Sequence, residues 1–572
     1  MTRDLAALTG TEFDLVVIGG GIVGACAAWD AAQRGLSVAL IERGDFGSAT
    51  SANLFKMVHG GIRYVQHADL PRVRQSSQER RVLLRIAPHL VGPLPIVVPT
   101  YGHGLKGKAA LRVGMGAYDA LTFDRNRGID DPARRIPRGR CISRDEVLRA
   151  FPGLDQRGLT GAGIIHDGQI FNPPRLVLAF LQRAAGAGAV AANYVEATGL
   201  LPAEGRPRGV RARDHLTGSE LEIRAKVVLN AAGPYAERFL TRAGGLRLDP
   251  AGTYSRDACF VVPRRLFGGD YALALQGRTS DPDARFSRGA RHLFVVPWRE
   301  YSLVGVWHVV YRGDPDAFTV TEADLQGFVA EVNAAYPPLG LTMDDVGLWN
   351  AGLVPFGDNP EGATNLRYGH RSRLVDHAGP DGIDNLITLI GVRFTTGRDD
   401  AERAVDLVCR KLGRRTPASR THMLPVQGGD IASFDDLLGD TVARHSARLP
   451  AAVVRSLVHN YGSDCERVIR HVDDDASMAE SLGDSPSIKA QIRHAARAEM
   501  AQTLGDVVFR RTDLATGRFP GLPALAAAAR VLGAELGWHP GRAEQEIDEV
   551  VRRFPRPVRG GQDDALTGGA TG

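Results

Sequence analysis

The spacing of apolar residues along this chain separates three kinds of structure. Residues 15–18 form a continuous apolar run typical of a buried strand, and residues 25–34 read as a helix rich in small side chains. Strand-like apolar segments return at 292–298 and 302–311, in a region that predicts mostly antiparallel strands. From Ser433 onward the strand signals vanish and helical periodicity dominates. The pattern predicts an α/β beginning, a sheet-rich middle and an all-helical end.

Three glycines and one acid give the first unit a specific chemistry. Gly19, Gly21 and Gly24 follow the first strand with the spacing G-x-G-x-x-G, and Glu42 ends a second strand. Gly19 permits a tight turn, Gly21 lets the backbone approach a pyrophosphate, and Gly24 allows close packing of helix and strand. The helix N-terminus favours an anion, and an acid at this distance accepts hydrogen bonds from an adenosine ribose. The unit therefore predicts an adenine dinucleotide, and Glu42 argues against NADP.

Composition narrows the class of protein further. The 44% hydrophobic residues and mean hydropathy of −0.14 are those of an ordinary soluble globular protein. No run approaches the roughly 20 apolar residues of a membrane-spanning helix, and no signal-peptide core is expected at the start. Five scattered cysteines without C-x-x-C spacing indicate a reducing cytoplasm and predict no metal site. The net charge of +5 lacks the basic stripe of a nucleic-acid-binding protein, so no nucleic acid is expected as a partner.

A longer motif follows the second strand and resembles a known enzyme family. Residues 45–65 and 79–99 contain a Thr-Ser pair, a lysine, a His-Gly-Gly turn and an Arg-Tyr pair, namely Thr50, Ser51, Lys56, His59, Gly60, Gly61, Arg63 and Tyr64. Further matching segments lie at 173–185, 227–239, 296–298, 311–324, 386–406, 459–468 and 503–515. Together these segments resemble the FAD-dependent glycerol-3-phosphate dehydrogenases, within the amino-acid-oxidase-like flavoprotein superfamily. The likeness runs from about residue 12 to about residue 555.

The resemblance implies FAD as the cofactor and assigns residues to two parts of one site. The residues expected to bind FAD are Gly19, Gly21, Gly24, Glu42, Arg43, Thr50, Ser51, Lys56, His59, Gly233, Arg393 and Thr395. The residues expected to act on the substrate are Arg63, Tyr64, His308 and Arg393. Arg393 would place a cation near the flavin N1 and C2 oxygen, where negative charge gathers on reduction.

The reaction class follows from the cofactor. Hydride passes from carbon to flavin N5 while a base removes the proton from the heteroatom. His308 and His59 are the candidate bases, because imidazole titrates nearest to neutral pH. For His59 the alternative is a role in holding the His-Gly-Gly turn, and for His308 it is a strand position facing solvent.

Several positions of the expected substrate pocket depart from the family pattern. They are Leu54, Phe55, Cys259, Trp307, His308, Val354 and Arg393. Val354 stands where the family has a phosphate-binding arginine, and such a loss costs about 1.5 to 3 kcal/mol of charge-assisted hydrogen bonding. Cys259 replaces a family histidine and is expected to be a small buried apolar residue. Trp307, Leu54 and Phe55 would offer an apolar wall to a larger or less charged substrate.

Three functions remain open on the sequence. The first is oxidation of a secondary alcohol, glycerol 3-phosphate to dihydroxyacetone phosphate or a related polyol or sugar phosphate. The second is a dehydrogenase or oxidase of the same fold acting on a larger hydroxy or amino compound in a biosynthetic pathway. The third is a non-catalytic FAD-binding protein. The electron acceptor is open between a quinone, oxygen and a soluble carrier, and a peripheral position at the inner face of the cytoplasmic membrane rests on the resemblance alone.

The same anchors predict the domain organisation, an α/β fold with a Rossmann-type FAD domain interleaved with an antiparallel-sheet substrate domain and a C-terminal helical cap. The FAD domain is expected from residues 12–105, 155–240 and 365–415. The remaining parts are a helical insertion at 106–154, the substrate domain at 241–364, a linker at 416–432, the helical domain at 433–555 and a disordered tail at 556–572.

Overall fold

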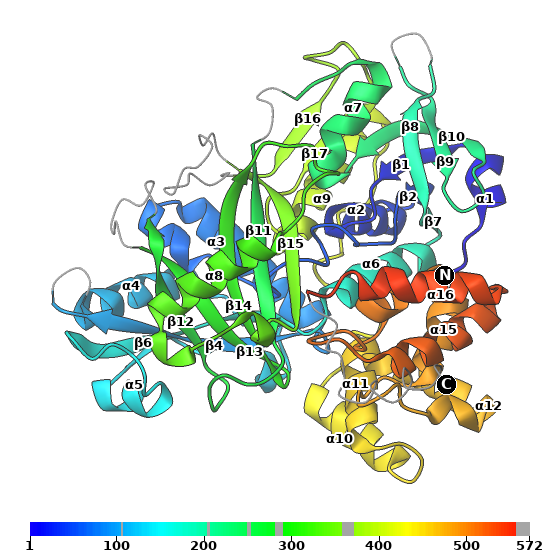
Figure 1. Cartoon of the computed structure of the whole chain (residues 1–572). Coiled ribbons are helices and arrows are strands. Elements are labelled where there is room, and N and C mark those ends of the chain that lie inside the picture. The colour runs from blue at the N-terminus through cyan, green and yellow to red at the C-terminus, as the bar shows by residue number, and fades with distance from the viewer. Residues whose placement is uncertain (104–106, 203–205, 249–252, 281–289, 357–370, 556–572) are drawn as a thin grey trace, which may run out of the picture.

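The chain folds around two β-sheets. The computed structural model describes residues 1–103, 107–202, 206–248, 253–280, 290–356 and 371–555. Figure 1 shows one sheet at the upper right, the other at the left, and the C-terminal helices below α6. No helix in these ranges is both long and apolar enough to cross a bilayer.

The first sheet is built around the predicted βαβ unit. Its hydrogen-bonded order is β16-β17-β10-β1-β2-β7, and β8 and β9 join through β10. The strands are β1 Phe13–Ile18, β2 Val38–Ile41, β7 Val190–Ala192, β8 Val195–Leu200, β9 Gly209–Asp214, β10 Glu220–Asn230, β16 Arg373–Asp376 and β17 Leu386–Ile390. β1 pairs in parallel with β2 and β10, and every residue of β1 is buried. Burial on both faces explains why this strand is continuously apolar instead of alternating.

Helices cover both faces of the first sheet. α2 (Ile22–Gln33), α6 (Pro173–Gly186) and α9 (Gly397–Lys411) share a core with one face. α7 (Ala236–Gly244) and α1 (Leu5–Gly10) share a core with the other face. The carboxyl ends of the parallel strands are left free to form a binding crevice.

The second sheet is mostly antiparallel. Its order is β15-β11-β14-β13-β12-β4-β6-β3, with β5 paired to β6. Among the described strands of this second sheet, only β4 and β12 pair in parallel. The strands are β3 Met57–Val58, β4 Val91–Tyr101, β5 Arg140–Ile142, β6 Leu159–Ile170, β11 Thr253–Val262, β12 Ala272–Ser280, β13 Ala290–Trp298, β14 Tyr301–Tyr311 and β15 Leu348–Phe356. α8 (Glu322–Ala335) packs on one face through Phe328 and Val332.

The remaining helices lie mainly at the end of the chain. Before them come α3 (Leu70–Ile86), α4 (Lys108–Leu121) and α5 (Arg144–Ala150). The C-terminal set is α10 Phe434–His445, α11 Ala451–Tyr461, α12 Cys465–Asp474, α13 Lys489–Ala498, α14 Leu504–Asp506, α15 Leu522–Leu536 and α16 Pro540–Val551. Several of these helices share a core with Val261, Trp298 and Leu303 of the second sheet. The helical end is thus packed against the sheet and is not a detached module.

The sheets do not follow the predicted domain limits. β3, β4 and β6 belong to the second sheet, although residues 12–105 and 155–240 were assigned to the FAD domain. The predicted helical insertion also contributes β5 to that sheet. The pairing partners of β4 and β6 decide which sheet these strands join, and the sequence pattern does not show those partners. Residues 416–432 contain no helix or strand, and the predicted tail at 556–572 lies outside the described residues.

Candidate active site

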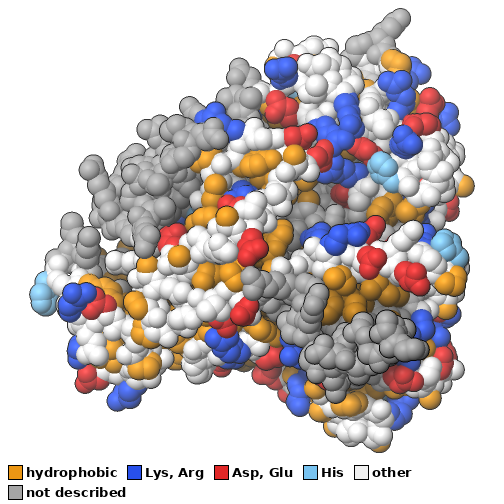
Figure 2. Space-filling model, in the orientation of Figure 1, with side chains coloured by type: hydrophobic (Ala, Val, Ile, Leu, Met, Phe, Trp, Pro, Cys, Tyr) orange, Lys and Arg blue, Asp and Glu red, His pale blue; other side chains and the backbone are white. Residues whose placement is uncertain are grey.

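A cavity of about 1220 Å³ lies between the two sheets. The first sheet lines it with the ends of its parallel strands, including Ile18, Ile41 and Gly391. The second sheet contributes side chains of β4, β6, β11, β13, β14 and β15. Figure 2 shows basic side chains gathered over α7, whose Arg238 and Arg242 line the cavity. A crevice at the carboxyl ends of parallel strands is the position expected for a dinucleotide.

The glycine-rich turn is shaped by close backbone contacts. Gly19 has φ +105°, and a Cβ there would lie 2.7 Å from the carbonyl oxygen of Ala231. A Cβ at Gly24 would lie 1.9 Å from the carbonyl oxygen of Gly19, so a side chain at Gly24 would push helix and turn apart. Gly21 is the N-cap of α2 and lines the cavity. The N-terminus of α2 therefore opens onto the cavity, and Gly21 itself places no side chain in front of it.

Residues 42–55, which join β2 to β3, are here named the cofactor loop because most of them line the cavity. The loop is tied to the glycine-rich turn. Glu42 accepts hydrogen bonds from the backbone N–H of Gly20 (2.7 Å) and Gly44 (2.9 Å), and Ser51 Oγ accepts one from Ile22 (3.0 Å). Burial raises the pKa of Glu42 in spite of these two donors. Its carboxylate oxygens keep further lone pairs that could serve a ribose.

Other residues predicted to bind the cofactor come from the cofactor loop itself and from distant parts of the chain. Gly233 and Thr395 both line the cavity, and Gly233 has φ +56° at the turn after β10. Arg43 lines the cavity, pairs with Asp316 at 2.8 Å and lies 3.8 Å over the ring of Tyr235. Thr50 Oγ1 donates to the backbone oxygen of Leu353 at 2.9 Å, which ties the loop to β15.

A cluster of cations and aromatic rings occupies another part of the cavity wall. The guanidinium of Arg72 lies 4.0 Å from the ring centre of Tyr64, and that of Arg393 lies 5.4 Å from it. Arg63 also lines the cavity. The ring of His59 meets Tyr64 edge-on at 5.9 Å. Burial, followed by the charge of Arg393, lowers the pKa of His59 to about 3. The cluster is therefore positive, and His59 adds a neutral imidazole.

The His-Gly-Gly turn is held by residues that the sequence did not single out. Asp167 accepts a hydrogen bond from the N–H of Gly60 at 2.5 Å and pairs with the buried Arg80 at 2.6 Å. A Cβ at Gly60 would lie 2.4 Å from Arg80. Asp167 and Arg80 thus hold this turn at Gly60, and the role of His59 stays a prediction.

His308 faces the cavity on β14 and is held by an acid. Its Nδ1 lies 2.6 Å from Asp257 Oδ1, and the two residues are direct partners in the β11–β14 pairing. Asp257 and His292 also line the cavity and were missed by the sequence reading. Alternation along β13 could have identified His292, because Leu293 and Val295 belong to the core on the opposite face while Phe294 also lines the cavity.

The predicted positions Lys56 and Trp307 lie away from the cavity. Lys56 does not line it, and its Nζ lies 4.8 Å from the ring centre of Trp298 and 3.4 Å from the backbone oxygen of Leu54. Trp307 is stacked on Phe328 at 5.5 Å in the core beneath the sheet, so it forms no wall of the cavity. Residues 307 and 308 point to opposite faces because they are neighbours on one strand.

Other positions that differ from the family pattern also fall into two groups, those outside the cavity lining and those within it. Cys259 is buried outside the cavity lining, and burial raises the pKa of its thiol to about 11, in keeping with the expected inert residue. Leu54, Phe55 and Val354 do line the cavity, as expected.

The residues present fit an FAD molecule. The cavity exceeds the roughly 1,000 Å³ at the upper end of ordinary ligand pockets. Side chains at Gly19 and Gly24 would clash with backbone atoms, which marks a turn built for close approach. The open N-terminus of α2 suits a pyrophosphate, and Glu42 borders the cavity where a ribose would lie.

Comparison with known proteins agrees with this arrangement. A family model described as FAD dependent oxidoreductase matches residues 14–391, and one described as the C-terminal domain of alpha-glycerophosphate oxidase matches residues 419–543. A glycerol-3-phosphate dehydrogenase of Synechocystis sp. is 31% identical over 96% of this chain and 97% of its own. A mitochondrial glycerol-3-phosphate dehydrogenase of Mus musculus is 31% identical over 95% of this chain and 73% of its own.

A solved structure supports the same assignment. The glycerol-3-phosphate dehydrogenase from Bacillus halodurans, complexed with FAD, superimposes with a TM-score of 0.74 at 25% identity and 96% coverage of both chains. The predicted fold class, the cofactor FAD and an oxidoreductase acting on CH–OH groups are thereby confirmed. The chain belongs to the glycerol-3-phosphate dehydrogenase family of FAD-dependent oxidoreductases.

Proposed function

We propose that this enzyme oxidises a secondary alcohol next to an anionic group, with glycerol 3-phosphate or a related polyol phosphate as substrate. The observation that carries the proposal is the cluster of Arg63, Arg72 and Arg393 around Tyr64 in a cavity that also presents His308. A guanidinium suits the oxygens of a phosphate, because its fork can donate two parallel hydrogen bonds. The names of the relatives point to the same substrate class.

FAD is proposed to lie with its pyrophosphate at the N-terminus of α2. Gly19 and Gly21 would allow its approach, and Glu42, Arg43, Thr50 and Ser51 of the cofactor loop would border it together with Gly233 and Thr395. Arg393 donates to Ser76 Oγ at 2.8 Å and to Gln75 Oε1 at 3.2 Å, which fixes its guanidinium at the cavity wall. Bound there, FAD supplies a hydride acceptor at N5.

The protein residues bind the anion and move the proton. Arg63, Arg393 and Tyr64 would hold the substrate anion, and Arg72 would add to the positive field. His308 would take the hydroxyl proton on Nε2, because its Nδ1 is already engaged with Asp257. The carboxylate of Asp257 fixes the ring orientation and stabilises the imidazolium that forms. Leu54 and Phe55 would keep water from the reacting carbon.

Anaerobic titration with sn-glycerol 3-phosphate tests the substrate. We expect bleaching of the flavin absorbance band in the native protein. In Arg63→Ala we expect loss of this bleaching with FAD still bound, because the substrate would lose an anion ligand. A flavin that only dithionite can reduce would exclude glycerol 3-phosphate. Loss of FAD from Arg63→Ala would move that residue from the substrate to the cofactor.

A larger substrate is the second candidate, and it rests on Leu54, Phe55 and Val354. These apolar side chains line the cavity, and Val354 stands where the family carries a phosphate-binding arginine. A panel of larger hydroxy and amino compounds, read by the same bleaching, distinguishes the two. Faster reduction by a larger compound than by glycerol 3-phosphate would favour it.

The electron acceptor is proposed to be a quinone at the cytoplasmic face of a membrane, from the family resemblance. Reoxidation of the reduced flavin by a soluble quinone, compared with oxygen, tests the acceptor. Co-sedimentation with vesicles of anionic lipid tests the membrane contact.

A further inference from the structure

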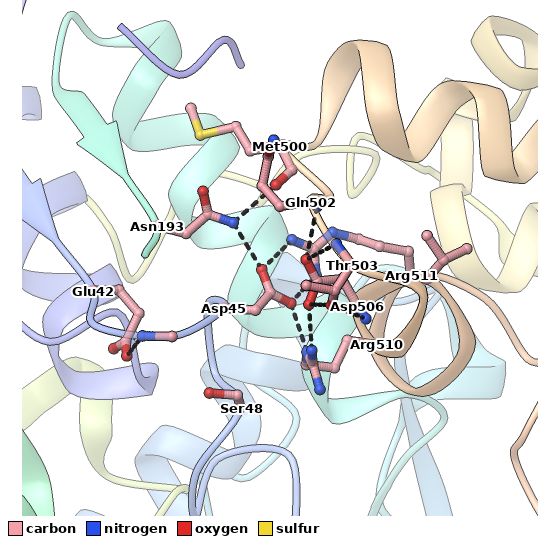
Figure 3. Close-up of polar contacts among 12 residues, drawn as sticks. Glu42, Asp45, Ser48, Asn193, Met500, Gln502, Thr503, Asp506, Arg510 and Arg511 are labelled. Atoms are coloured by element: carbon pink, nitrogen blue, oxygen red, sulfur yellow. Dashed lines mark hydrogen bonds and ion pairs between the residues drawn. The ribbon is translucent and has the colours of Figure 1, made fainter. Parts of the chain in front are cut away.

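The cofactor loop carries a carboxylate, that of Asp45, which is buried on the side of the loop away from the cavity. Asp45 belongs to the loop, but it does not line the cavity, and its side chain has no exposed surface. The neighbouring loop residues Gly44 and Gly47 do line the cavity. Asp45 therefore points from the loop into the protein, toward the C-terminal helices (Figure 3).

Two successive arginines of the C-terminal region meet this carboxylate. Arg511 donates from both terminal nitrogens, to Oδ2 at 2.7 Å and to Oδ1 at 2.6 Å, and Arg510 Nε donates to Oδ2 at 2.5 Å. Both reach it from a π-helical turn, Val507–Arg511. Asn193 completes the set, since its Nδ2 donates to Asp45 at 3.1 Å and to the backbone oxygen of Met500 at 2.8 Å.

A second connection runs through Asp506. Arg510 also donates to Asp506 Oδ1 at 2.5 Å, and the hydroxyl of Tyr194 donates to the same oxygen at 2.7 Å. The backbone N–H of Tyr194 donates to the carbonyl of Gly44 at 2.9 Å, and that of Val195 donates to the carbonyl of Glu42 at 2.7 Å. The start of the cofactor loop is therefore held from two sides by one ion-pair network, and Asp506 anchors the second side to α14.

The cofactor loop in turn holds the glycine-rich turn. Besides the contacts of Glu42 and Ser51, the N–H of Gly47 donates to the carbonyl of Gly20 at 2.9 Å. Phe46 packs so closely on Gly20 that a Cβ there would lie 2.7 Å from its ring. A displacement of the loop at Asp45 would thus move the backbone that is proposed to face the pyrophosphate.

We infer that Asp45 is a positioning residue for FAD, which fixes the cofactor loop through Arg510 and Arg511 and makes retention of FAD dependent on docking of the C-terminal helices. The inference rests on the proposed place of FAD in the cavity. Removal of the Asp45 carboxylate would leave the charge of Arg511 buried without its partner. The resulting loss of free energy would destabilise the contact between the cofactor loop and the C-terminal helices. FAD binding and C-terminal docking then favour each other, because each stabilises the same loop conformation.

The test compares two buried ion pairs of the same interface. Glu499 accepts from Arg175 of α6 with both oxygens at 2.7 Å and has no exposed surface. Among the described residues, the other partners of its side chain are Gln182 and His494, which lie outside the cofactor loop, although its backbone oxygen accepts from Arg511. Asp45→Asn removes one buried charge from the contact between the cofactor loop and the C-terminal region. Glu499→Gln removes one from the contact between α6 and the same region. Each protein is stripped of FAD, and its melting temperature and its FAD dissociation constant are measured.

We expect both variants to melt lower, whereas only Asp45→Asn weakens FAD strongly. The expected rise in the dissociation constant is about tenfold or more for Asp45→Asn and below about threefold for Glu499→Gln, with partial rescue in Asp45→Glu. Backbone amides of residues 42–55 should also exchange with deuterium faster in apo Asp45→Asn alone. Equal losses of FAD affinity in the two variants would overturn the inference, since a general weakening of the interface would then suffice.

Two further variants keep the result interpretable. If Asp45→Asn does not fold, Arg511→Lys keeps the charge, removes the bidentate fork and should show the same pattern in weaker form. An unchanged FAD affinity in folded Arg511→Lys would count against the inference. Retention of FAD by Gly21→Val would instead contradict the proposed place of FAD, so the two failures are distinguishable.

Discussion

At the scale of single residues, the decisive contrast is between neighbours on β14. His308 faces the cavity with Asp257 at 2.6 Å from its Nδ1, whereas Trp307 is stacked on Phe328 in the core. Cys259 lies on the same face of β11 as Asp257, two positions earlier, but it is buried outside the cavity lining, with its Sγ 3.8 Å from the backbone oxygen of Leu54. The proposed proton transfer therefore uses an imidazole whose orientation a carboxylate sets, and it gives no role to the Cys259 thiol, whose pKa is raised by burial.

His308→Asn should slow substrate-driven flavin reduction by about 10² to 10⁴-fold, because a positioned general base contributes on that order. FAD content should stay unchanged, since the base is not proposed to bind the cofactor. Stopped-flow absorbance of the flavin band measures the rate. Trp307→Phe is the matched control on the same strand and should change the melting temperature but not the rate. A reduction rate in His308→Asn equal to that of the native enzyme would remove His308 from the reaction.

At the scale of elements, the unit β1–turn–α2 is the part whose function follows most directly from its geometry. A Cβ at Gly24 would collide with the carbonyl oxygen of Gly19, and one at Gly19 would collide with that of Ala231. Gly24 therefore serves the packing of the unit, whereas Gly19 and Gly21 line the cavity and are the glycines proposed to let the backbone approach the ligand. The N–H of Ile22 at the start of α2 donates to Ser51 Oγ, and the positive end of the helix dipole at this position favours an anion in the cavity.

Gly21→Val should abolish FAD binding and leave the apoprotein folded. A Cβ at this position meets only Ser51 Oγ within 4 Å, at 3.1 Å, so the branched side chain would occupy the pyrophosphate's space and not the core. Visible absorbance of the purified protein reports FAD, and circular dichroism melting reports the fold. Gly186→Val, at a helix end where a Cβ meets nothing within 4 Å, should remain yellow. A yellow Gly21→Val protein would contradict the dinucleotide site.

At the scale of the whole molecule, charge pairs join segments hundreds of residues apart. Asp45 and Arg511 connect the cofactor loop to the C-terminal helices, and Arg175 and Glu499 do the same for α6. Burial by itself would raise the pKa of Asp45, but Arg511 and Arg510 outweigh it and lower the pKa to about 2. The folded state thus favours the ionised carboxylate relative to the unfolded chain, whose aspartates titrate near 3.8.

The stabilisation from Asp45 should therefore be complete above about pH 4 and be lost as the pH falls toward 2. A shift of this size corresponds to about 2 kcal/mol. We expect the difference in melting temperature between the native protein and Asp45→Asn to be large at pH 6 and to shrink steadily below pH 4. Asp130→Asn, a change at an exposed carboxylate, should follow the native curve throughout. A difference that stays constant from pH 6 to pH 3 would show that ionisation of Asp45 does not drive docking.

Much of the fold was accessible from local patterns alone. The glycine spacing, the continuous apolar run of β1 and the acid after β2 predicted the βαβ unit and the dinucleotide, because each depends on residues within about one supersecondary unit. The strands at 292–298 and 302–311 and the helical end were predicted for the same reason. Local patterns could not show that β3, β4 and β6 join the second sheet, because an apolar strand carries no local record of its pairing partner.

The cofactor class, the family and the succession of an α/β beginning, a sheet-rich middle and a helical end could all be read from the sequence. Which side chains share the cavity depends on the packing of distant elements. That packing turns Lys56 and Trp307 away, pairs Asp257 with His308 through the register of β11 and β14, and brings Arg511 to Asp45. The physical reason is that spacing along the chain fixes which face of an element a residue occupies, whereas the packing of distant elements fixes what that face meets.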